Sequence, residues 1–483
     1  MNWTSWIDSA VRPLADALAA VVFFKIPIGD SQAPFVVLWL VAGAVFFTVR
    51  FRFINFWGFR HGLSLVFGRG GGTQTERREE GEISHFQALS AAVSGTVGIG
   101  NIGGVAVAIT LGGPGAALWM LLAGILGMST KFVECTLGVL YREVHEDGSV
   151  SGGPMFYLRK GLAERGWPTL GKVLGSFYAV GIVIGCMGIG NMFQSNQAFV
   201  QIMGVTGGSE SWIADKGWLV GVALALLVGA VIIGGIRSIA RVTSKLVPFM
   251  AILYLVGAFL VIALNAEAIP WAIGEMFRRA FEPAAAGGGL LGALIIGFQR
   301  AVFSNEAGIG SATIAHAAVK TDEPLTEGFV ALLEPFIDTV VICTATALVI
   351  ITTLYYEPSL AEGLGGIETT SAAFERRLPW SPYPLALAAT LFALSTMVSW
   401  SYYGLKGWVY LFGDAPRTLT IFNLIFCFFI VVGSSIQLSA VLDFSDALVF
   451  LICVPNILGL YILTPVVRRE LASYLERRAA GGA

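Results

Sequence analysis

Two short segments combine glycine with small polar residues inside apolar stretches of the chain. They are residues 94–101 (SGTVGIGN) and 304–311 (SNEAGIGS), which share a first Ser and a Gly-Ile-Gly core 210 positions apart. Glycine costs about 1 kcal/mol in a helix interior, and backbone groups released at membrane depth are tolerated only beside a cavity or inside protein. Such breaks expose N–H groups at one half-helix and carbonyls at the other, which suits a zwitterion beside a cation. The pair therefore predicts the binding site of a secondary transporter.

The alternative reading of these glycines is close packing between helices without any ligand. For one such segment this alternative would be favoured. A matched pair with Asn101, Asn305 and Glu306 beside the glycines favours the binding site.

The composition is that of a membrane protein. The chain of 483 residues is 55% hydrophobic and 13% charged, whereas soluble domains carry about 25% charged residues. The four His residues form no HExxH or comparable pattern, and the five Cys residues are scattered through apolar runs as small core residues. We therefore expect no catalytic or metal cluster, no organic cofactor and no nucleic-acid partner, and an enzyme is the least favoured class.

Eleven apolar runs must position the two segments. Each run is long enough to cross a bilayer, at about 20 residues per span. They cover residues 33–49, 86–111, 115–140, 172–202, 217–235, 246–265, 289–316, 328–354, 383–403, 418–437 and 443–467. The sequence GGPG at 112–115 predicts a tight turn, so that the second and third spans form a hairpin. Residues 2–24 resemble an amphipathic surface helix, and we expect no secretory signal peptide because a basic segment before an apolar run is missing.

The distribution of positive charge predicts the orientation. Of the 30 Lys and Arg residues, 21 fall on one side of the predicted spans, 7 on the other and 2 within spans. Because cytoplasmic loops carry the excess of Lys and Arg, the N-terminus is expected outside and the C-terminus in the cytoplasm. The expected location is the plasma membrane, which is the bacterial inner membrane, and the protein is expected to cross it several times.

The spacing of the two segments predicts an inverted repeat. Spans two to six and seven to eleven form two sets of five, and each set begins with a Gly-Ile-Gly segment. Because five is odd, the second set enters the membrane from the opposite face, which brings the two breaks together near the midplane. The expected organisation is an N-terminal amphipathic segment (1–32), a peripheral first span with a cytoplasmic loop (33–84), the first repeat (85–270), the second repeat (271–467) and a cytoplasmic tail (468–483).

Longer motifs resemble one family of transporters. SGTVGIGNIGGVAVAITLGGPGAALWM, TKFVECTLGVLYRE, SGGPMFYL and QRAVFSNEAGIGSATIAHAA are similar to motifs of the alanine or glycine:cation symporter family of sodium-coupled amino acid transporters. The resemblance runs from about residue 33 to 467. It implies an all-α polytopic membrane protein with 11 transmembrane helices, in which one peripheral helix accompanies a 5+5 inverted-repeat core of leucine-transporter type.

Candidate substrate contacts gather around the breaks. The N–H groups of Gly98, Ile99 and Gly100 are expected to bind a carboxylate, because they lie at a half-helix N-terminus. The groups expected near the ammonium are Thr96, Asn101, Phe303 and Ser304. Gln194 on the fourth span either fixes the ligand or makes an interhelical hydrogen bond. Phe303 and Trp400 are candidate walls of a small pocket, and either ring is equally consistent with ordinary packing.

The resemblance also implies a sodium site between the first core helix and the ninth span. Na⁺ is a hard cation that prefers oxygen ligands, as Ca²⁺ and Mg²⁺ do. The expected ligands are the side chains of Ser395 and Thr396 and the carbonyls of Ser94, Val97 and Phe392. From the residues alone, hydrogen bonds from Ser395 and Thr396 back to their own helix are the favoured interpretation, and the resemblance reverses this preference.

Ionisable residues at membrane depth are functional candidates. Lys131 and Glu134 are spaced i,i+3, so we expect them to neutralise each other on one helix face. Arg300 and Glu306 flank the second break and either pair or gate a path. Glu334 and Asp338 are spaced i,i+4 and would repel if both were ionised, so one of them is a proton carrier or both lie near water.

The leading hypothesis is a sodium-coupled symporter that imports small neutral amino acids, alanine or glycine, by alternating access. Its partners are then the amino acid, Na⁺ and the lipid bilayer, with Na⁺ as coupling ion. The runner-up is proton coupling through Glu306, Glu334 or Asp338. A channel is less favoured because it needs a continuous lined pore.

Overall fold

The computed structural model describes residues 3–28, 31–68, 81–282, 289–355, 366–436 and 439–480, and it is almost entirely helical. Most of the predicted loop before the second span, residues 69–80, lies outside the described residues. The helices of the first half are α1 (Trp3–Val22), α2 (Phe35–Arg50), α3 (Ile54–Trp57), α4 (Phe59–Val66), α5 (His85–Thr96), α6 (Gly103–Leu140), α7 (Pro154–Glu164), α8 (Pro168–Met187), α9 (Phe193–Val205), α10 (Gly217–Ile232) and α11 (Gly235–Leu264).

The helices of the second half are α12 (Ile269–Ala280), α13 (Gly289–Asn305), α14 (Thr313–His316), α15 (Pro324–Ala331), α16 (Leu333–Pro335), α17 (Thr344–Ile350), α18 (Ile367–Glu375), α19 (Pro382–Phe412), α20 (Pro416–Ser435) and α21 (Ser439–Ala480). Short 3-10 turns are η1 (Ile99–Asn101), η3 (Gly208–Glu210) and η4 (Ala266–Ala268), and π-helical turns are η2 (Gly188–Met192), η5 (Phe336–Cys343) and η6 (Ile351–Tyr355). Two antiparallel pairs of strands are β1 (Lys25–Ile28) with β2 (Ser31–Pro34), and β3 (Glu143–Val144) with β4 (Val150–Ser151).

Seven helical stretches among the described residues are long and apolar enough to cross a membrane. An eighth is counted if α2 and the following bent segment Ile54–Val66 form one span. Helix α6 has 38 residues, about 57 Å at 1.5 Å per residue, which exceeds a hydrocarbon core of about 30 Å. Its helical geometry fails at Gly113 (φ 66°, ψ −175°), inside the predicted GGPG turn. The count of eleven spans stays a prediction.

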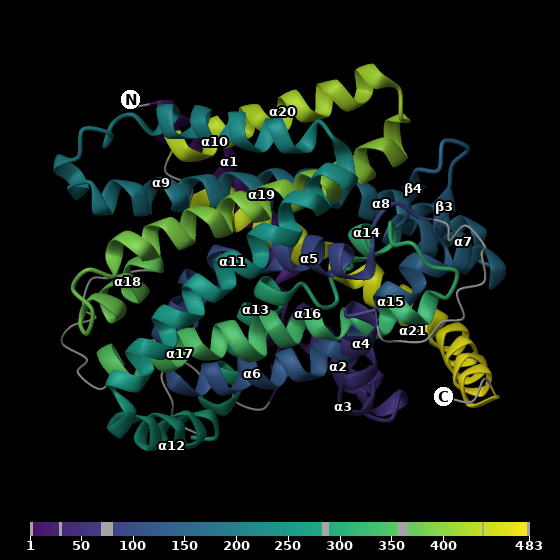
Figure 1. Ribbon diagram of the computed structural model, residues 1–483, viewed down its shortest axis with the longest axis horizontal. Coiled ribbons are helices and arrows are strands. Elements are labelled where there is room, and N and C mark those ends of the chain that lie inside the picture. The colour runs from purple at the N-terminus through teal and green to yellow at the C-terminus, as the bar shows by residue number, and fades with distance from the viewer. Residues whose placement is uncertain are drawn as a thin grey trace.

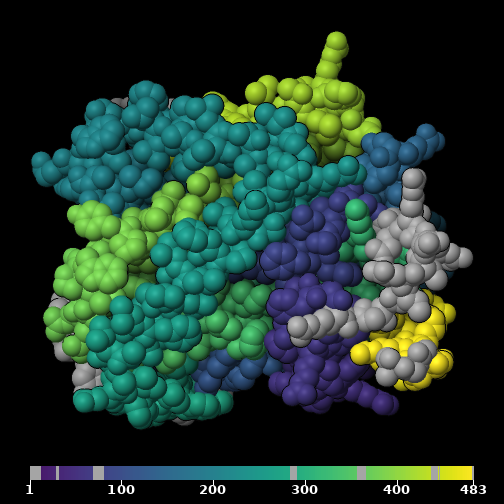
Figure 2. All heavy atoms as spheres, viewed as in Figure 1, coloured from purple at the N-terminus to yellow at the C-terminus, as the bar shows by residue number. Residues whose placement is uncertain are grey.

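Segments distant in sequence lie side by side in the bundle (Figure 1). Helices α10 and α20 run together along one edge, and α12 crosses the end of α6 at the opposite edge. Helices α5 and α13, which lead into the two glycine segments, lie in the middle of the view. In the space-filling view, purple atoms of the N-terminal helices contact green atoms from the second half of the chain (Figure 2). Helix α5 packs against α14 and α19, and α13 packs against α6, so both halves of the chain meet at the two segments.

Candidate functional site

The first glycine segment interrupts a helix, as its sequence predicts. Helix α5 begins with a capping box, in which the Ser84 hydroxyl accepts from the Gln87 N–H and the Gln87 side chain accepts from the Ser84 N–H. The helix ends at Thr96, and Val97 (ψ 91°) and Gly98 (φ −135°, ψ −159°) are extended. The short turn η1 then leads into α6. The Val97 N–H still donates to the Val93 carbonyl at 2.7 Å, and the carbonyls that follow lie at the helix end, where α-helical donors are missing.

The second segment is unwound over a longer stretch. Glu306 (φ 57°), Gly308 (φ 96°) and Gly310 (φ 85°) adopt left-handed backbone conformations between the end of α13 and the start of α14. Such conformations are easily reached by glycine and costly for other residues. Both predicted breaks therefore exist in the structure.

Side chains from two other helices hold the second break open. The Gly308 N–H donates to Oε1 of Glu134 at 3.1 Å, and Nδ2 of Asn456 donates to the Gly308 carbonyl at 2.8 Å and to Glu134 Oε1 at 2.7 Å. The predicted Lys131–Glu134 pair is therefore wrong: Lys131 Nζ donates to Oε1 of Glu334 at 3.0 Å. Asn456 was missed by the sequence reasoning, although a polar residue inside the last apolar run is a recognisable signal.

One carboxylate joins the two breaks. Oδ1 of Asp338 accepts from Nδ2 of Asn101 at 2.5 Å, and Oδ2 accepts from the hydroxyls of Ser304 at 2.9 Å and Thr339 at 2.6 Å. Each of these residues is buried. Asn101 ends the first break and Ser304 precedes the second, so Asp338 sets their separation.

The candidate carboxylate-binding N–H groups lie at the first break, and two of them donate to side-chain oxygens. The Gly98 N–H donates to Oδ1 of Asn101 at 2.8 Å, and the Ile99 N–H lies 3.4 Å from Oε1 of Gln194. A Cβ on Gly100 would contact the ring of Phe303 at 3.4 Å. The structure therefore brings Gly98, Ile99, Gly100, Asn101, Gln194, Phe303 and Ser304 together. The Thr96 hydroxyl instead faces carbonyls of its own helix turn, Ala92 and Val93.

Four of the five predicted sodium ligands, Ser94, Phe392, Ser395 and Thr396, lie where the end of α5 contacts α19, and the fifth, Val97, directly follows α5. The Ser94 hydroxyl donates to the Ser395 carbonyl at 2.7 Å, and the Ser395 hydroxyl donates to the Phe392 carbonyl at 2.9 Å and lies 3.5 Å from the Ser94 carbonyl. Oγ1 of Thr396 has no hydrogen-bond partner among the described residues, although the residue is only 2% exposed. A Cβ on Gly98 would lie 2.6 Å from that oxygen. A buried hydroxyl without a partner is costly, and these oxygen donors fit a hard cation.

Trp400 lies one turn after Thr396 on α19 and contacts the second break. Its Nε1 donates to Oε1 of Glu306 at 2.9 Å, and a Cβ on Gly190 would clash with its side chain at 2.3 Å. Glu306 also accepts from the hydroxyl of Ser311. No Arg300–Glu306 ion pair forms among the described residues. Trp400 therefore supports the second break through Glu306. Arg300 instead lines a cavity beside the breaks.

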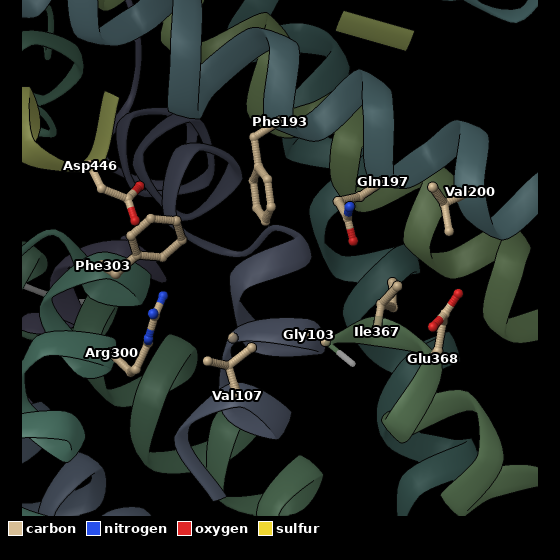
Figure 3. A pocket seen from close by; sticks show the side chains of 12 residues that line it. Gly103, Val107, Phe193, Gln197, Val200, Arg300, Phe303, Ile367, Glu368 and Asp446 are labelled. Carbon is tan, nitrogen blue, oxygen red and sulfur yellow. The ribbon is translucent and has the colours of Figure 1, made fainter. Parts of the chain in front are cut away.

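A cavity of about 450 Å³ adjoins the breaks (Figure 3). Figure 3 shows Phe193 and Gln197 pointing into it from α9, Arg300 and Asp446 on one side and Glu368 on the other. The residues that line it are Gly103, Gly104, Val107, Phe193, Gln197, Val200, Arg300, Phe303, Gly366, Ile367, Glu368 and Asp446.

Phe303 separates this cavity from the first break. Its ring meets that of Phe193 edge-on at 6.0 Å, and the Arg300 guanidinium lies over it at 5.9 Å. The sequence reasoning found Phe303 but missed Phe193, which directly precedes Gln194. A ligand entering from the cavity would meet this aromatic pair before it reached Gly100.

Comparison with known proteins identifies relatives over nearly the whole chain. The model of the sodium:alanine symporter family matches residues 24–483. AgcS of Methanococcus maripaludis, a sodium/alanine symporter, is 38% identical over 447 residues, which are 92% of this chain and 95% of that protein. GlnT of Bacillus subtilis, a probable sodium/glutamine symporter, is 32% identical over 445 residues, which are 92% of this chain and 88% of that protein.

A solved structure supports the fold. MhsT in complex with L-phenylalanine superposes with a TM-score of 0.58 at 16% identity, over 82% of this chain and 99% of that chain. At this identity the likeness concerns the fold alone, which is of the leucine-transporter type. The relatives are transporters and not enzymes. The chain thus belongs to the sodium:alanine symporter family.

Proposed function

We propose that this protein is a sodium-coupled symporter that imports small neutral amino acids, alanine or glycine, across the bacterial inner membrane. The observation that carries the proposal is the unpartnered hydroxyl of Thr396, buried beside Gly98 where the first break contacts α19. Na⁺ bound there would lie next to the N–H groups assigned to the substrate carboxylate. The name of AgcS agrees with this substrate class, and the name of GlnT shows that relatives differ in substrate.

In the proposed binding site, the N–H groups of Gly98, Ile99 and Gly100 orient the carboxylate of the amino acid. Asn101, Ser304 and Gln194 supply polar atoms around the zwitterion, and Thr96 supplies a carbonyl. Phe303 limits the length of the side chain that fits. Because Gly98 and Ile99 donate to Asn101 and Gln194 in the structure, these two side chains must rearrange when substrate binds.

Coupling follows if Na⁺ stabilises the arrangement that accepts substrate. A ligand shifts a conformational equilibrium only by its difference in affinity for the two states. Ser94 and Val97 belong to the first break, whereas Phe392, Ser395 and Thr396 belong to α19. A cation shared between them therefore favours the state in which α5 and α19 are in contact. One repeat then rocks against the other to release both ligands. In this proposal the N-terminus lies outside and the C-terminus in the cytoplasm.

The test is uptake of labelled alanine into proteoliposomes at fixed pH, with external Na⁺ or with choline in its place. We expect uptake to need Na⁺ and to be competed by unlabelled glycine. Uptake that is undiminished in choline would remove the sodium proposal. A sodium-independent uptake that follows an imposed proton gradient would support the proton-coupled alternative. Counterflow of label against unlabelled alanine separates a carrier from a channel.

A further inference from the structure

A fully buried histidine lies between two buried glutamates, away from the proposed substrate and sodium sites. Nδ1 of His316 in α14 is 2.7 Å from Oε1 of Glu327, and its Nε2 is 3.7 Å from Oε2 of Glu334. All three side chains have no solvent exposure. The Nε2 and Oε2 atoms have no hydrogen-bond partner among the described residues. Both ring nitrogens therefore face a carboxylate, and one of these contacts is too long for a direct hydrogen bond.

If His316 is neutral and both glutamates are ionised, the cluster lacks one proton. A neutral imidazole has a single N–H, so its second nitrogen would present a lone pair to a carboxylate oxygen. Lys131, also fully buried, balances only one of the two glutamates through its contact with Glu334. A buried charge must be paired. Glu327 therefore needs a proton on one of its own neighbours, His316 or the His85 that lies 2.5 Å from it, or on a carboxyl group of the cluster.

A second histidine extends the cluster to the protein surface. His85, the first residue of α5, places Nδ1 2.5 Å from the other carboxylate oxygen of Glu327, and its side chain is 23% exposed. Glu327 thus bridges a buried and a partly exposed histidine. A proton released by His316 can leave through Glu327 and His85 without crossing apolar core.

Other titratable groups face the cluster from every helix packed against α14. They are His85 on α5, Lys131, Glu134 and Cys135 on α6, and Tyr403 on α19, which lies within electrostatic range of Glu334. The elements packed against α5 add Arg60 and His61 on α4, Arg237, Arg241 and Lys245 on α11, Asp338 on η5, and Tyr402 and Lys406 on α19. Of this second group, His61 bonds to Tyr474, Arg237 pairs with Glu82, and Asp338 bonds to Asn101.

The cluster lies on the side of the breaks opposite the cavity. The cavity is lined by α6 after the first break and by α13 before the second, whereas His85 precedes the first break and His316 follows the second. On this side, hydrogen bonds to the backbone hold the segments around the cluster together. Ile83 and Val319 form a parallel bridge, the Lys320 N–H donates to the Ile83 carbonyl at 2.8 Å, and Arg142 donates to the carbonyls of Ala317, Val319 and Thr321.

We propose that Glu327, His316 and Glu334 form a proton-binding site that holds this side of the transporter closed and exchanges its proton through His85. With the proton bound, α5, α14 and α15 are held together by complementary charge. Loss of the proton leaves two buried carboxylates against one lysine, which weakens the closed arrangement. Opening on this side therefore becomes easier as the pH of the adjoining solution rises.

The test is alanine counterflow in proteoliposomes at saturating Na⁺, with the same pH on both sides so that the orientation of the protein does not matter. The wild-type rate should rise with pH through the neutral range, by up to about tenfold per pH unit for one proton. His316→Gln, which cannot hold the proton, should give a flat profile. His145→Gln, at a histidine between β3 and β4 that bonds to the Ser151 hydroxyl, should keep the wild-type slope. A flat wild-type profile, or an unchanged slope in His316→Gln, would overturn the proposal.

Thermal unfolding of the purified proteins in detergent gives a readout independent of transport. The stability supplied by the bound proton is present at low pH and is lost as the pH rises. The unfolding temperature of the wild type should therefore fall towards that of His316→Gln as pH increases. If His316→Gln does not fold, Glu327→Gln takes its place in both measurements. A constant difference between wild type and variant at all pH values contradicts the proposal. Sodium-independent counterflow, by contrast, would refute only the proposed sodium coupling.

Discussion

Nδ2 of Asn101 donates to Oδ1 of Asp338 at 2.5 Å, although the two residues are 237 positions apart. The same carboxylate accepts from Ser304 at 2.9 Å. Asp338 therefore ties the end of the first break to the start of the second. Any change in the distance between the breaks must stretch or break one of these bonds.

Asp338→Asn should weaken transport. A hydrogen bond to a charged group contributes about 1.5–3 kcal/mol, so losing one at this junction should raise the KM for alanine by about tenfold. Thr352→Val is the matched control, because Thr352 lies later in the same helical stretch and bonds only within its own helix. Initial uptake rates against alanine concentration measure the effect. Equal KM values for Asp338→Asn and wild type would show that the junction does not position the substrate site.

Thr396→Ala should weaken the sodium dependence more than the fold. The hydroxyl makes no hydrogen bond in the structure, so its loss costs the protein little, whereas a lost oxygen ligand worth about 1.4 kcal/mol raises half-saturating Na⁺ about tenfold. Ser401→Ala on the same helix is the control, since that hydroxyl bonds only to the Val398 carbonyl. Binding of labelled alanine against Na⁺ concentration, together with unfolding temperature in choline, separates the two effects. An unchanged sodium dependence excludes Thr396 as a ligand.

Gly98→Ala should fold and yet lose sodium-dependent uptake. The backbone of Gly98 is extended (φ −135°), so alanine is allowed there, but its Cβ would lie 2.6 Å from Oγ1 of Thr396. Overpacking of this kind costs about 1–3 kcal/mol. Gly204→Ala serves as the control because no atom lies within 4 Å of the added carbon. Full sodium-dependent uptake by Gly98→Ala would mean that Na⁺ does not occupy the space beside Thr396.

Phe303→Ala should widen the substrate range. The ring lies against Gly100 and against Phe193, so its removal opens the path from the cavity to the first break. A hydrophobic wall discriminates by about tenfold or more for each methylene. We expect leucine uptake relative to alanine to rise by about tenfold in competition assays, with Phe177→Ala on the exposed surface of α8 as control. An unchanged ratio of leucine to alanine uptake would mean that residues other than Phe303 limit the size of the substrate.

The ion pairs on α12 predict an acid-sensitive contribution to stability. Arg278 and Arg279 bond to Glu275 at 2.6–2.8 Å and lower the pKa of this carboxyl from 4.5 to about 2, chiefly through the Arg278 hydrogen bonds. Because the folded-state pKa is the lower one, the contribution is present above pH 4.5 and is lost as the pH falls towards 2.

Glu275→Gln should therefore unfold at a lower temperature than wild type at neutral pH, and the difference should vanish in acid. The effect is small, because both arginines are substantially exposed. Glu267→Gln, which lies in the preceding turn, controls for loss of a surface charge. A difference that persists at low pH would contradict the assignment.

Two expectations about charged residues are wrong. Lys131 and Glu134 share a helix at i,i+3, yet Lys131 bonds to Glu334, 203 positions away. Glu334 and Asp338 are both fully buried, so the alternative that both lie near water is wrong. The π-helical turn η5 begins at Phe336, between them. The wider turn changes the direction of the following side chains. Glu334 faces Lys131 while Asp338 faces Asn101.

The sequence by itself determined where helices form and where they break. Hydrophobicity and glycine act on the backbone within a few residues, so the apolar runs and the two unwound segments follow from local composition. The resemblance to known transporters predicted that a sodium site joins Ser94 to Ser395 and Thr396. The tertiary structure alone decided which partner each buried polar group takes: Asp338 for Asn101, Glu334 for Lys131, Glu306 for Trp400. The reason is that a buried charge or amide must be satisfied by whichever group packing brings within about 3 Å, and that choice depends on how separate helices face one another.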